Sequence, residues 1–196
     1  MAKRIAEIER ETKETTVRLM IDLDGEGKAA ISTGVGFFDH MLDLLARHAY
    51  FDMTLTAEGD TAVDDHHTVE DVGICLGQAL KQALGDKQGI YRFGSASVPM
   101  DEARADVSVD LSGRPYLVYQ TCELPEKIGT FDTQLIGEFL QALATHGGVN
   151  LHVSVPCGEN GHHIIEAVFK ALAKALAQAI RLEDREKGVP STKGML

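Results

Sequence analysis

The pattern His-His-x-x-Glu occurs twice in this chain, and each copy runs into an apolar stretch with helical periodicity. The two copies, 96 residues apart, are His66, His67 and Glu70, and His162, His163 and Glu166. Two flanking segments also match in the same order, 38–55 with 136–153 and 19–33 with 107–121. Coincidence between amphipathic segments can account for either flanking match alone, but not for the repeated motif. The sequence therefore predicts a duplicated unit of about 90 residues.

Each half of the chain shows the same order of expected elements: strand, strand, helix, strand, helix. The expected strands are 17–23, 28–33, 52–57, 106–111, 116–121 and 150–155, and the expected helices are 37–47, 69–84, 134–145 and 164–180. The first two strands of each half flank the turn-like sequences DLDGEG and DLSGRP, so both pairs are expected to form hairpins. This repeated β-β-α-β-α order indicates an α+β fold in which two similar layers of sheet and helices pack together.

The two halves are expected to share one core. No linker rich in Pro, Gly or Ser separates residues 1–90 from residues 91–186. Residues 187–196 break the helical pattern at Gly188 and Pro190, which indicates a mobile C-terminal arm. We therefore expect one compact domain made of two repeat halves and an arm.

The composition excludes several classes of partner. A net charge of −11 argues against binding to nucleic acid or to an anionic membrane through overall charge. No apolar run is long enough to span a membrane, and the N-terminal residues lack the apolar core of a signal peptide. Three scattered cysteines do not form a disulfide framework, so we expect reduced thiols and a cytoplasmic protein.

The repeated motif predicts two metal sites. In a helix, residues i and i+4 share a face, so His66 can act with Glu70, and His162 with Glu166, on one ion each. The middle histidines are turned by about 100° and cannot easily serve the same ion as their neighbours. The duplication suggests one ion bound by His66, Glu70 and His163, and another bound by His162, Glu166 and His67. Imidazole and carboxylate ligands without thiolate fit Mn, Fe, Co or catalytic Zn.

The structural alternative is that these polar residues serve only as helix caps, since Asp64, Asp65 and Asn160 precede the two helices. Capping explains one such motif more easily than two in register.

Further histidines extend the predicted metal sites. His40 is a candidate fourth ligand, and Glu138 occupies its repeat-equivalent position. His48 and His146 are also equivalent, and they can lie behind the ligands, face a substrate, or be ordinary surface or core residues. His152 alternates with apolar neighbours and is expected to face solvent.

Scattered cations and acids supply candidates for a phosphate site and for proton transfer. The candidates for one shared phosphate site are Arg92, Arg114, Lys170, Ser191, Thr192, Lys193 and Gly194. Taken alone, each of these residues is better explained as part of the solvated surface. Glu14, and Asp101 with Glu102, are candidate acid–base groups.

The set GFFDHML, DDHHTVED, PMDEA, DLSGRPY, ENGHHIIEAVFKA and PSTKG, in this order and spacing, closely resembles the imidazoleglycerol-phosphate dehydratase family of histidine biosynthesis. The resemblance covers essentially the whole chain. It implies a duplicated α+β fold with two four-stranded sheets, of the ribosomal protein S5 domain 2-like type. It also implies two Mn²⁺ per active site and a homo-oligomer of twenty-four subunits with the metals at subunit interfaces.

The resemblance also implies roles for individual residues. The metal ligands would be the two His-His-x-x-Glu motifs and His40, with Glu138, His146 or water completing the second site. The reaction would convert D-erythro-imidazoleglycerol phosphate to imidazoleacetol phosphate and water through a metal-bound imidazolate. Glu14 would be an acid–base group that contacts the substrate, and the carboxylates of Glu70 and Glu166 would be its catalytic companions. The candidate cations and the 191–194 segment, together with His48, would bind the substrate, and the arm would close over it.

Two other classes of function use the same ligands. One is a binding or structural module in which the duplicated motif holds a structural metal, with no open coordination position. The other is a di-metal hydrolase of phosphate esters with a bridging water. Turnover of imidazoleglycerol phosphate with and without Mn²⁺ distinguishes all three.

Overall fold

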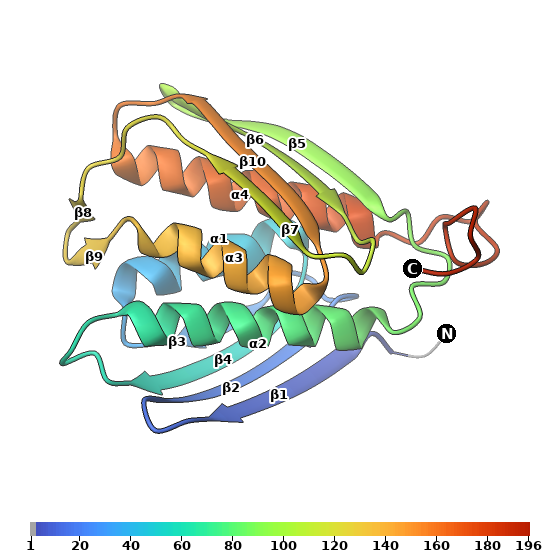
Figure 1. The fold of residues 1–196 in the computed structure, drawn as a ribbon, viewed down its shortest axis with the longest axis horizontal. Helices are drawn as coiled ribbons and strands as arrows, with labels where there is room; N and C mark the ends of the chain where they lie inside the picture. The colour runs from blue at the N-terminus through green and yellow to red at the C-terminus, as the bar shows by residue number, and fades with distance from the viewer. Residues whose placement is uncertain (1–2) are drawn as a thin grey trace.

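The structure, a computed structural model, describes residues 3–196 and contains a duplicated unit of six elements (Figure 1). The first unit consists of β1 (Ile5–Glu11), β2 (Thr15–Asp22), β3 (Ala29–Ser32), α1 (Gly36–Ala49), β4 (Asp52–Gly59) and α2 (His66–Leu84). The second consists of β5 (Phe93–Met100), β6 (Ala103–Asp110), β7 (Tyr116–Gln120), α3 (Leu135–Gly147), β10 (Asn150–Cys157) and α4 (Gly161–Ile180). A short hairpin of β8 (Lys127–Ile128) and β9 (Phe131–Asp132) interrupts the connection between β7 and α3.

The two units form two four-stranded sheets with the same strand order. The orders are β1-β2-β4-β3 and β5-β6-β10-β7. In each sheet the last strand runs parallel to its neighbour and the other pairs are antiparallel. The predicted α+β class with two four-stranded sheets is confirmed.

Two details of the predicted unit are wrong. The expected order lacks the first strand of each unit, β1 and β5. Both are edge strands with few buried side chains, so the alternation of apolar and polar residues along them is weak. The expected hairpins between residues 17–23 and 28–33, and between 106–111 and 116–121, do not form. A helix crosses from β3 to the parallel strand β4, which inserts between β2 and β3, and β10 does the same in the second unit.

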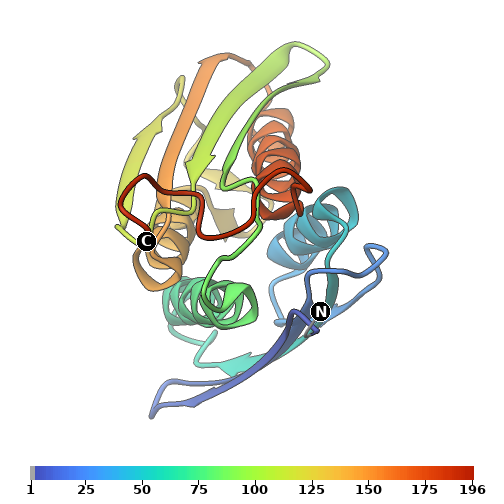
Figure 2. The same cartoon turned by 90° about the vertical axis from the view of Figure 1, so that its right-hand side faces the viewer.

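The four helices of residues 3–196 lie in a layer between the two sheets (Figures 1 and 2). α1 packs against α4, and α2 packs against α3, so each pair combines one helix from each half. Phe38, Phe139 and Phe169 meet in this layer, with ring centroids 5.3 Å apart for Phe38 and Phe139 and 5.4 Å for Phe139 and Phe169. A single apolar core therefore contains residues of both halves.

The α2–α3 pair approaches closely at two glycines. A Cβ atom on Gly73 would lie 2.9 Å from the carbonyl oxygen of Phe139, and one on Gly77 would lie 2.7 Å from the backbone nitrogen of Gly147. Any larger side chain at these positions would meet backbone. The two glycines therefore allow the backbones of α2 and α3 to approach each other.

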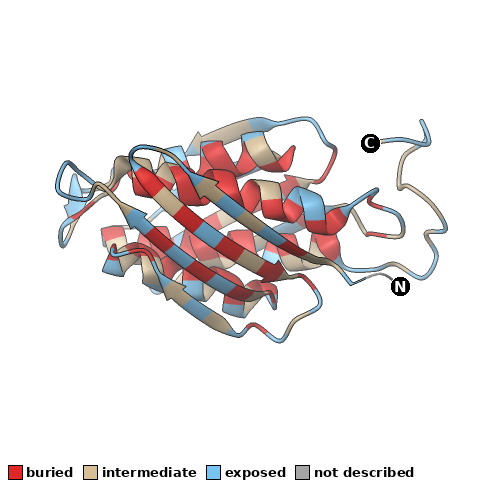
Figure 3. Ribbon diagram, turned by 90° about the horizontal axis from the view of Figure 1, so that it is seen from below, coloured by how far each residue is buried: buried red, intermediate tan, exposed pale blue. Residues whose placement is uncertain are grey.

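The sheets turn one face to the helices and the other to the outside, and buried and exposed residues alternate along the strands of the first sheet (Figure 3). His152 is exposed on β10, as predicted. No helix within residues 3–196 has the length and apolar character needed to cross a membrane.

Residues 187–196 lie against the rest of the chain. The Gly188 carbonyl accepts a hydrogen bond from the Gly89 backbone at 2.9 Å, and the Pro190 carbonyl accepts one from the Arg92 guanidinium at 2.8 Å. The C-terminal arm therefore docks where the two halves join.

Candidate active site

Two histidines and a glutamate converge between α1 and α4. Oε2 of Glu166 lies 3.1 Å from Nε2 of His162 and 3.6 Å from Nε2 of His40. The Glu166 side chain is only 10% exposed, whereas His40 and His162 are 46% and 39% exposed, so the donors line an accessible edge. His40 comes from the first half of the chain and the other two from the second, and α1–α4 packing brings them together.

This cluster has the donor set of a divalent metal site. One ligand atom from each of the three residues lies within 4.8 Å of the other two. Two imidazole nitrogens and a carboxylate oxygen suit Mn, Fe, Co or Zn and leave positions for further ligands. His40, His162 and Glu166 thus fit the metal that the sequence predicts at this end of α4.

Lys170 holds the Glu166 carboxylate from the other side, with Nζ 2.5 Å from Oε1. Burial alone would raise the pKa of Glu166, but hydrogen bonding and charge from Lys170 outweigh it and leave the pKa below its usual value. Glu166 is therefore a carboxylate that stays ionised at neutral pH. An ionised carboxylate is the form that a metal ion binds.

The repeat-equivalent end of α2 is less assembled. His66 lines a hollow of about 390 Å³ with Asp64, Lys127 and Leu135. Glu138, the equivalent of His40, is exposed on α3. Within residues 3–196, no other three donors converge as His40, His162 and Glu166 do. The predicted ligands His66 and Glu70 on α2 and Glu138 on α3 thus lie on one helix pair, but their ligand atoms do not converge.

Helix capping is present but does not involve the histidine side chains. Asp64 accepts a hydrogen bond from the backbone of His66, and Asn160 accepts one from the backbone of His162, both at 2.9 Å. Because Asp64 and Asn160 accept these backbone hydrogen bonds, the imidazoles remain available for other partners. The capping alternative therefore does not explain the paired histidines.

The middle histidine of each motif faces different partners from its neighbour, as the helical turn predicts. Nδ1 of His67 lies 3.0 Å from Asp60, and Nε2 lies 3.7 Å from Glu14. The hydrogen bond to Asp60 raises the pKa of His67. No hydrogen bond, ion pair or aromatic contact within residues 3–196 links one motif to the other, so the predicted sharing of ions between motifs stays a prediction.

His163 has a similar environment. Its Nδ1 lies 2.8 Å from Glu102 and its Nε2 lies 3.8 Å from Asp101. The hydrogen bond to Glu102 raises the pKa of His163. The pKa of Glu102 falls to about 2, because the backbone of Asn160 and the ring of His163 donate to it.

Most of the predicted phosphate ligands surround one hollow of about 780 Å³ at the docked arm. Its lining includes Arg92, Arg114, Ser191, Thr192 and Lys193, and Gly194 follows directly in the chain. Arg92 is already engaged there, since its Nε lies 2.7 Å from Asp110 and its Nη1 donates to Pro190. Arg114 and Lys193 are exposed. In this chain Arg92 therefore holds the arm, and Arg114 and Lys193 are the exposed cations at this hollow.

Lys170 and His48 lie apart from that hollow, on the α1–α4 pair. Burial lowers the pKa of His48, and the charges of Lys174 and Lys170 add to that effect. The predicted convergence of all the cations on one phosphate does not occur within a single chain. The reason is that Lys170 sits midway along α4, whereas the arm docks near its C-terminal end.

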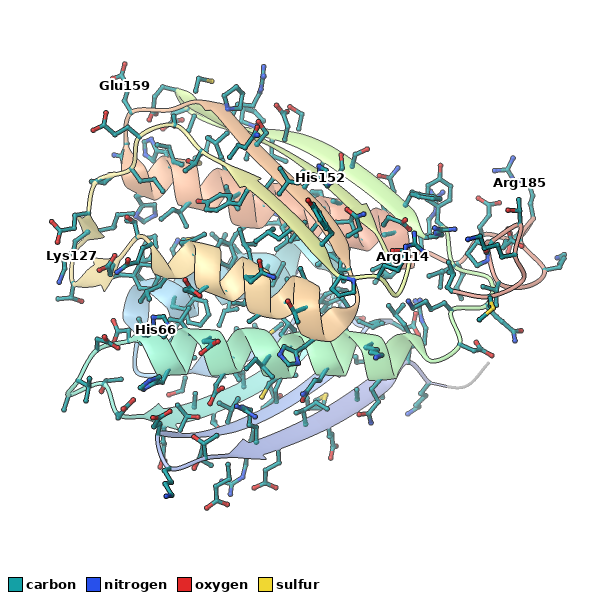
Figure 4. The ribbon with its side chains drawn as sticks, in the orientation of Figure 1. His66, Arg114, Lys127, His152, Glu159 and Arg185 are labelled. Atoms are coloured by element: carbon teal, nitrogen blue, oxygen red, sulfur yellow. The ribbon has the colours of Figure 1, made fainter. Side chains whose placement is uncertain are left out.

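The His40–His162–Glu166 cluster and the arm occupy opposite ends of the molecule. Figure 4 shows His66 and Glu159 at one end, and Arg114 and Arg185 at the other. α4 has 20 residues and is about 30 Å long, with His162 in its first turn and the arm near its last. One chain therefore cannot bring the arm cations to its own His40–His162–Glu166 cluster in this conformation.

Two acids of this region were not among the predicted site residues. Asp60 follows β4 and contacts His67, and the buried Asp71 accepts hydrogen bonds from Arg10 and Thr15. Asp71 follows Glu70 directly, but no local pattern marks its partners, because they lie on β1 and β2. Only the three-dimensional contacts show that Asp71 ties the segment carrying Glu14 to α2.

Comparisons with known proteins show the family of this chain. Residues 33–176 match the family model of imidazoleglycerol-phosphate dehydratase. Imidazoleglycerol-phosphate dehydratases from a Geobacillus species and from Halalkalibacterium halodurans are each 60% identical over 193 residues, covering 98% of this chain and 99% and 100% of the relatives.

Two solved structures are similar in fold. The enzyme of that name from Staphylococcus aureus has a TM-score of 0.82 at 40% identity, covering 91% of this chain and 99% of its own. The structure from Pyrococcus furiosus has a TM-score of 0.83 at 39% identity, covering 96% and 100%. By sequence over nearly its whole length and by fold, this chain belongs to the imidazoleglycerol-phosphate dehydratase family.

Proposed function

We propose that this chain is a metal-dependent hydro-lyase that converts D-erythro-imidazoleglycerol phosphate to imidazoleacetol phosphate and water in histidine biosynthesis. The observation that carries the metal dependence is the convergence of His40, His162 and Glu166, within 4.8 Å of one another. The family membership supports the substrate.

The difficulty of the reaction lies in the proton that must be removed. The substrate loses a hydroxyl from the carbon attached to imidazole and a proton from the next carbon, which no carbonyl acidifies. Two Mn²⁺ ions would supply Lewis acidity toward the two imidazole nitrogens, favouring the anionic ring that can expel the hydroxyl. The residues proposed to hold them are His40, His66, His67, Glu70, Glu138, His162, His163 and Glu166.

Glu14 is the proposed group that moves the proton. Its carboxylate is 55% exposed and lies 3.7 Å from Nε2 of His67, at the edge where a substrate beside the metal ligands would sit. Its backbone is fixed, since Thr12 accepts from its nitrogen at 3.1 Å and its carbonyl accepts from Asp60 at 3.1 Å. A fixed, accessible carboxylate can remove the proton, after which the enol becomes the ketone. Glu70 and Glu166 act in this proposal as carboxylates beside the reacting ring.

The active site is proposed to form between copies of the chain. The exposed cations at the arm, with Ser191 and Thr192, would hold the phosphate beside the metal ligands of another subunit, where Lys170 and His48 lie. The separation of these two regions by most of the length of α4 supports this arrangement. Twenty-four subunits is the assembly size that we propose from the resemblance, and the cytoplasm is the proposed location, supported by three free cysteines.

Turnover of imidazoleglycerol phosphate by metal-depleted protein, before and after addition of Mn²⁺, tests this function. We expect activity only with metal. Equal activity without metal would contradict the proposal, and hydrolysis of the phosphate ester in place of dehydration would favour a di-metal hydrolase.

Light scattering after treatment with EDTA tests the shared site. If metals join subunits, chelation should reduce the particle mass as well as the activity, because metal binding then contributes to assembly. An unchanged mass, with metal demonstrably removed, would place the metal sites within single chains.

A further inference from the structure

We propose that Asp60 and Glu102 are positioning residues that fix the middle histidines, His67 and His163, with Nε2 directed toward a metal ion. The inference deepens the proposed function and rests on it. It assigns to these two acids a role on the ligands, distinct from ligation and from proton transfer.

At His67 the geometry is that of a carboxylate holding one side of an imidazole. The two carboxylate oxygens of Asp60 lie 3.0 and 3.2 Å from Nδ1. Asp60 is itself restrained, because its backbone nitrogen donates to the Glu14 carbonyl and its carbonyl accepts from Val63 at 2.7 Å. The imidazole is therefore held from a fixed turn between β4 and α2.

At His163 the same arrangement is built from another segment. Oε2 of Glu102 lies 2.8 Å from Nδ1, while Oε1 accepts hydrogen bonds from the backbone of Glu159 at 3.1 Å and of Asn160 at 2.8 Å. One carboxylate thus joins the β5–β6 turn to the start of α4 and to the histidine that follows. Glu102 has little freedom to move away from the ring.

A carboxylate at Nδ1 determines which nitrogen can bind a metal. It keeps the proton of the neutral imidazole on Nδ1, which leaves the lone pair on Nε2 and makes that nitrogen a stronger ligand. The first histidine of the second motif differs, because its Nε2 faces Glu166. A carboxylate that holds Nδ1 is therefore a feature of the two middle histidines, His67 and His163.

The two acids come from positions that are not equivalent in the repeat. The repeat counterpart of Asp60 is Gly158, and that of Glu102 is Glu14. Glu14 also approaches the equivalent histidine, His67, but its carboxylate lies 3.7 Å from Nε2, so the hydrogen bond at Nδ1 comes from Asp60 instead. The same hydrogen bond built twice from different segments points to a requirement of the site itself.

Titration of the metal-depleted protein with Mn²⁺, following free Mn²⁺ by electron paramagnetic resonance, tests the inference. We expect Asp60→Ala to weaken the sites that use His67 by about 10–100-fold and to leave the other sites unchanged. Asp60→Asn, which keeps an acceptor oxygen of the same size, should recover part of the affinity. Glu58→Ala, which removes an exposed acid from β4, is the matched control and should bind as the unchanged protein does.

Glu102→Gln should weaken the other class of site, and the double variant should weaken both. Circular dichroism of the metal-free variants checks that they are folded. Unchanged affinity at both classes in folded Asp60→Ala would overturn the inference alone, provided that the unchanged protein binds Mn²⁺. Absence of Mn²⁺ binding by the unchanged protein would overturn the proposed metal dependence as well.

Discussion

The α1–α4 and α2–α3 pairs have the same plan, since each joins a motif helix of one half to the first helix of the other, yet they differ in chemistry. α4 carries Lys170 and Lys174 where α2 carries Ile74 and Gln78. The glycines at 73 and 77 of α2 correspond to Phe169 and Ala173 of α4. The duplicated packing plan has thus been kept while the residues along the two seams have diverged.

The difference shows that the same helix packing can support two different arrangements of candidate metal ligands. Small residues let α2 and α3 approach through their backbones, and no third donor among residues 3–196 joins the histidine and glutamate of that helix pair. At α1–α4, His40 completes a cluster with His162 and Glu166, and Lys170 keeps the carboxylate ionised. The α1–α4 pair thus carries a cluster of three candidate metal ligands, whereas the candidate ligands of the α2–α3 pair lie apart. Four predictions test this difference.

The largest effect is expected for the metal-binding carboxylates. Glu166→Gln should lower kcat by roughly 100-fold or more and remove one class of Mn²⁺ site, while Glu70→Gln should remove the other class. Metal analysis after gel filtration, together with steady-state kinetics, measures both effects. If Glu166→Gln retained the full metal content, the α1–α4 cluster would not be a metal site.

The next largest effect is expected on stability, where α2 and α3 approach each other closely. Gly77→Ala should lower the free energy of unfolding by about 1–3 kcal/mol, because the new Cβ would meet backbone atoms of α3. Ala173→Gly, at the equivalent position of α4, should cost only about 1 kcal/mol through helix propensity. Urea unfolding of metal-free protein compares the two. A gain in stability for Gly77→Ala would mean that propensity, and not packing, governs this seam.

A smaller effect concerns acid stability. The pKa of Glu166 is below its usual value in the folded protein, so its contribution to stability is present above pH 4.5 and is lost as the pH falls through the folded pKa. In Lys170→Met, the hydrogen bond and charge that most oppose the effect of burial are lost, and only His162 and His40 still lower the pKa of Glu166. That pKa therefore rises, so the loss should begin at a higher pH and cost roughly 1 kcal/mol. Unfolding of metal-free protein at pH values between 3 and 7 measures the shift.

Lys174→Met is the control for that experiment. Lys174 lies over the ring of Tyr50, with Nζ 4.9 Å from its centroid, on the same helix. Its acid profile should follow the unchanged protein. Coincident profiles for both lysine variants would show that Lys170 does not hold Glu166.

The smallest effect is expected from a substitution that makes the α2–α3 pair resemble the α1–α4 pair. Glu138→His places an imidazole where α1 has His40, and imidazole favours Co²⁺ over Mn²⁺ more than carboxylate does. The ratio of Co²⁺ to Mn²⁺ affinity at that class of site should rise by about tenfold or less. Competition titrations measure the ratio. An unchanged ratio would indicate that His146 or water, and not Glu138, completes the site.

The positions of the helices were predictable from the sequence, whereas the pairing of the strands was less predictable. The helices expected at 37–47 and 164–180 match α1 and α4 closely, because apolar periodicity records which face is buried. The hairpin expected after β2 is wrong because a strand much later in the chain takes the place beside it. Pairing across a crossover leaves no trace in the local pattern.

The same limit applies to the site. The motif spacing correctly separates the directions of His162 and His163, which face Glu166 and Glu102. Nothing in the spacing reveals that Arg92 binds Asp110, or that Asp60 reaches His67. Those contacts depend on where distant turns meet, which the tertiary fold determines.

Because α1 packs on α4, the order of synthesis constrains when the site can form. His40 and Glu166 are 126 residues apart in the chain, so their contact closes a loop that spans most of the protein. Such distant contacts slow folding, and the first half is made well before α4 leaves the ribosome. Until then the buried face of α1, including Met41 and Leu45, lacks its partner helix. The candidate metal cluster is therefore a late product of folding, and metal binding there would favour only chains that have folded to completion.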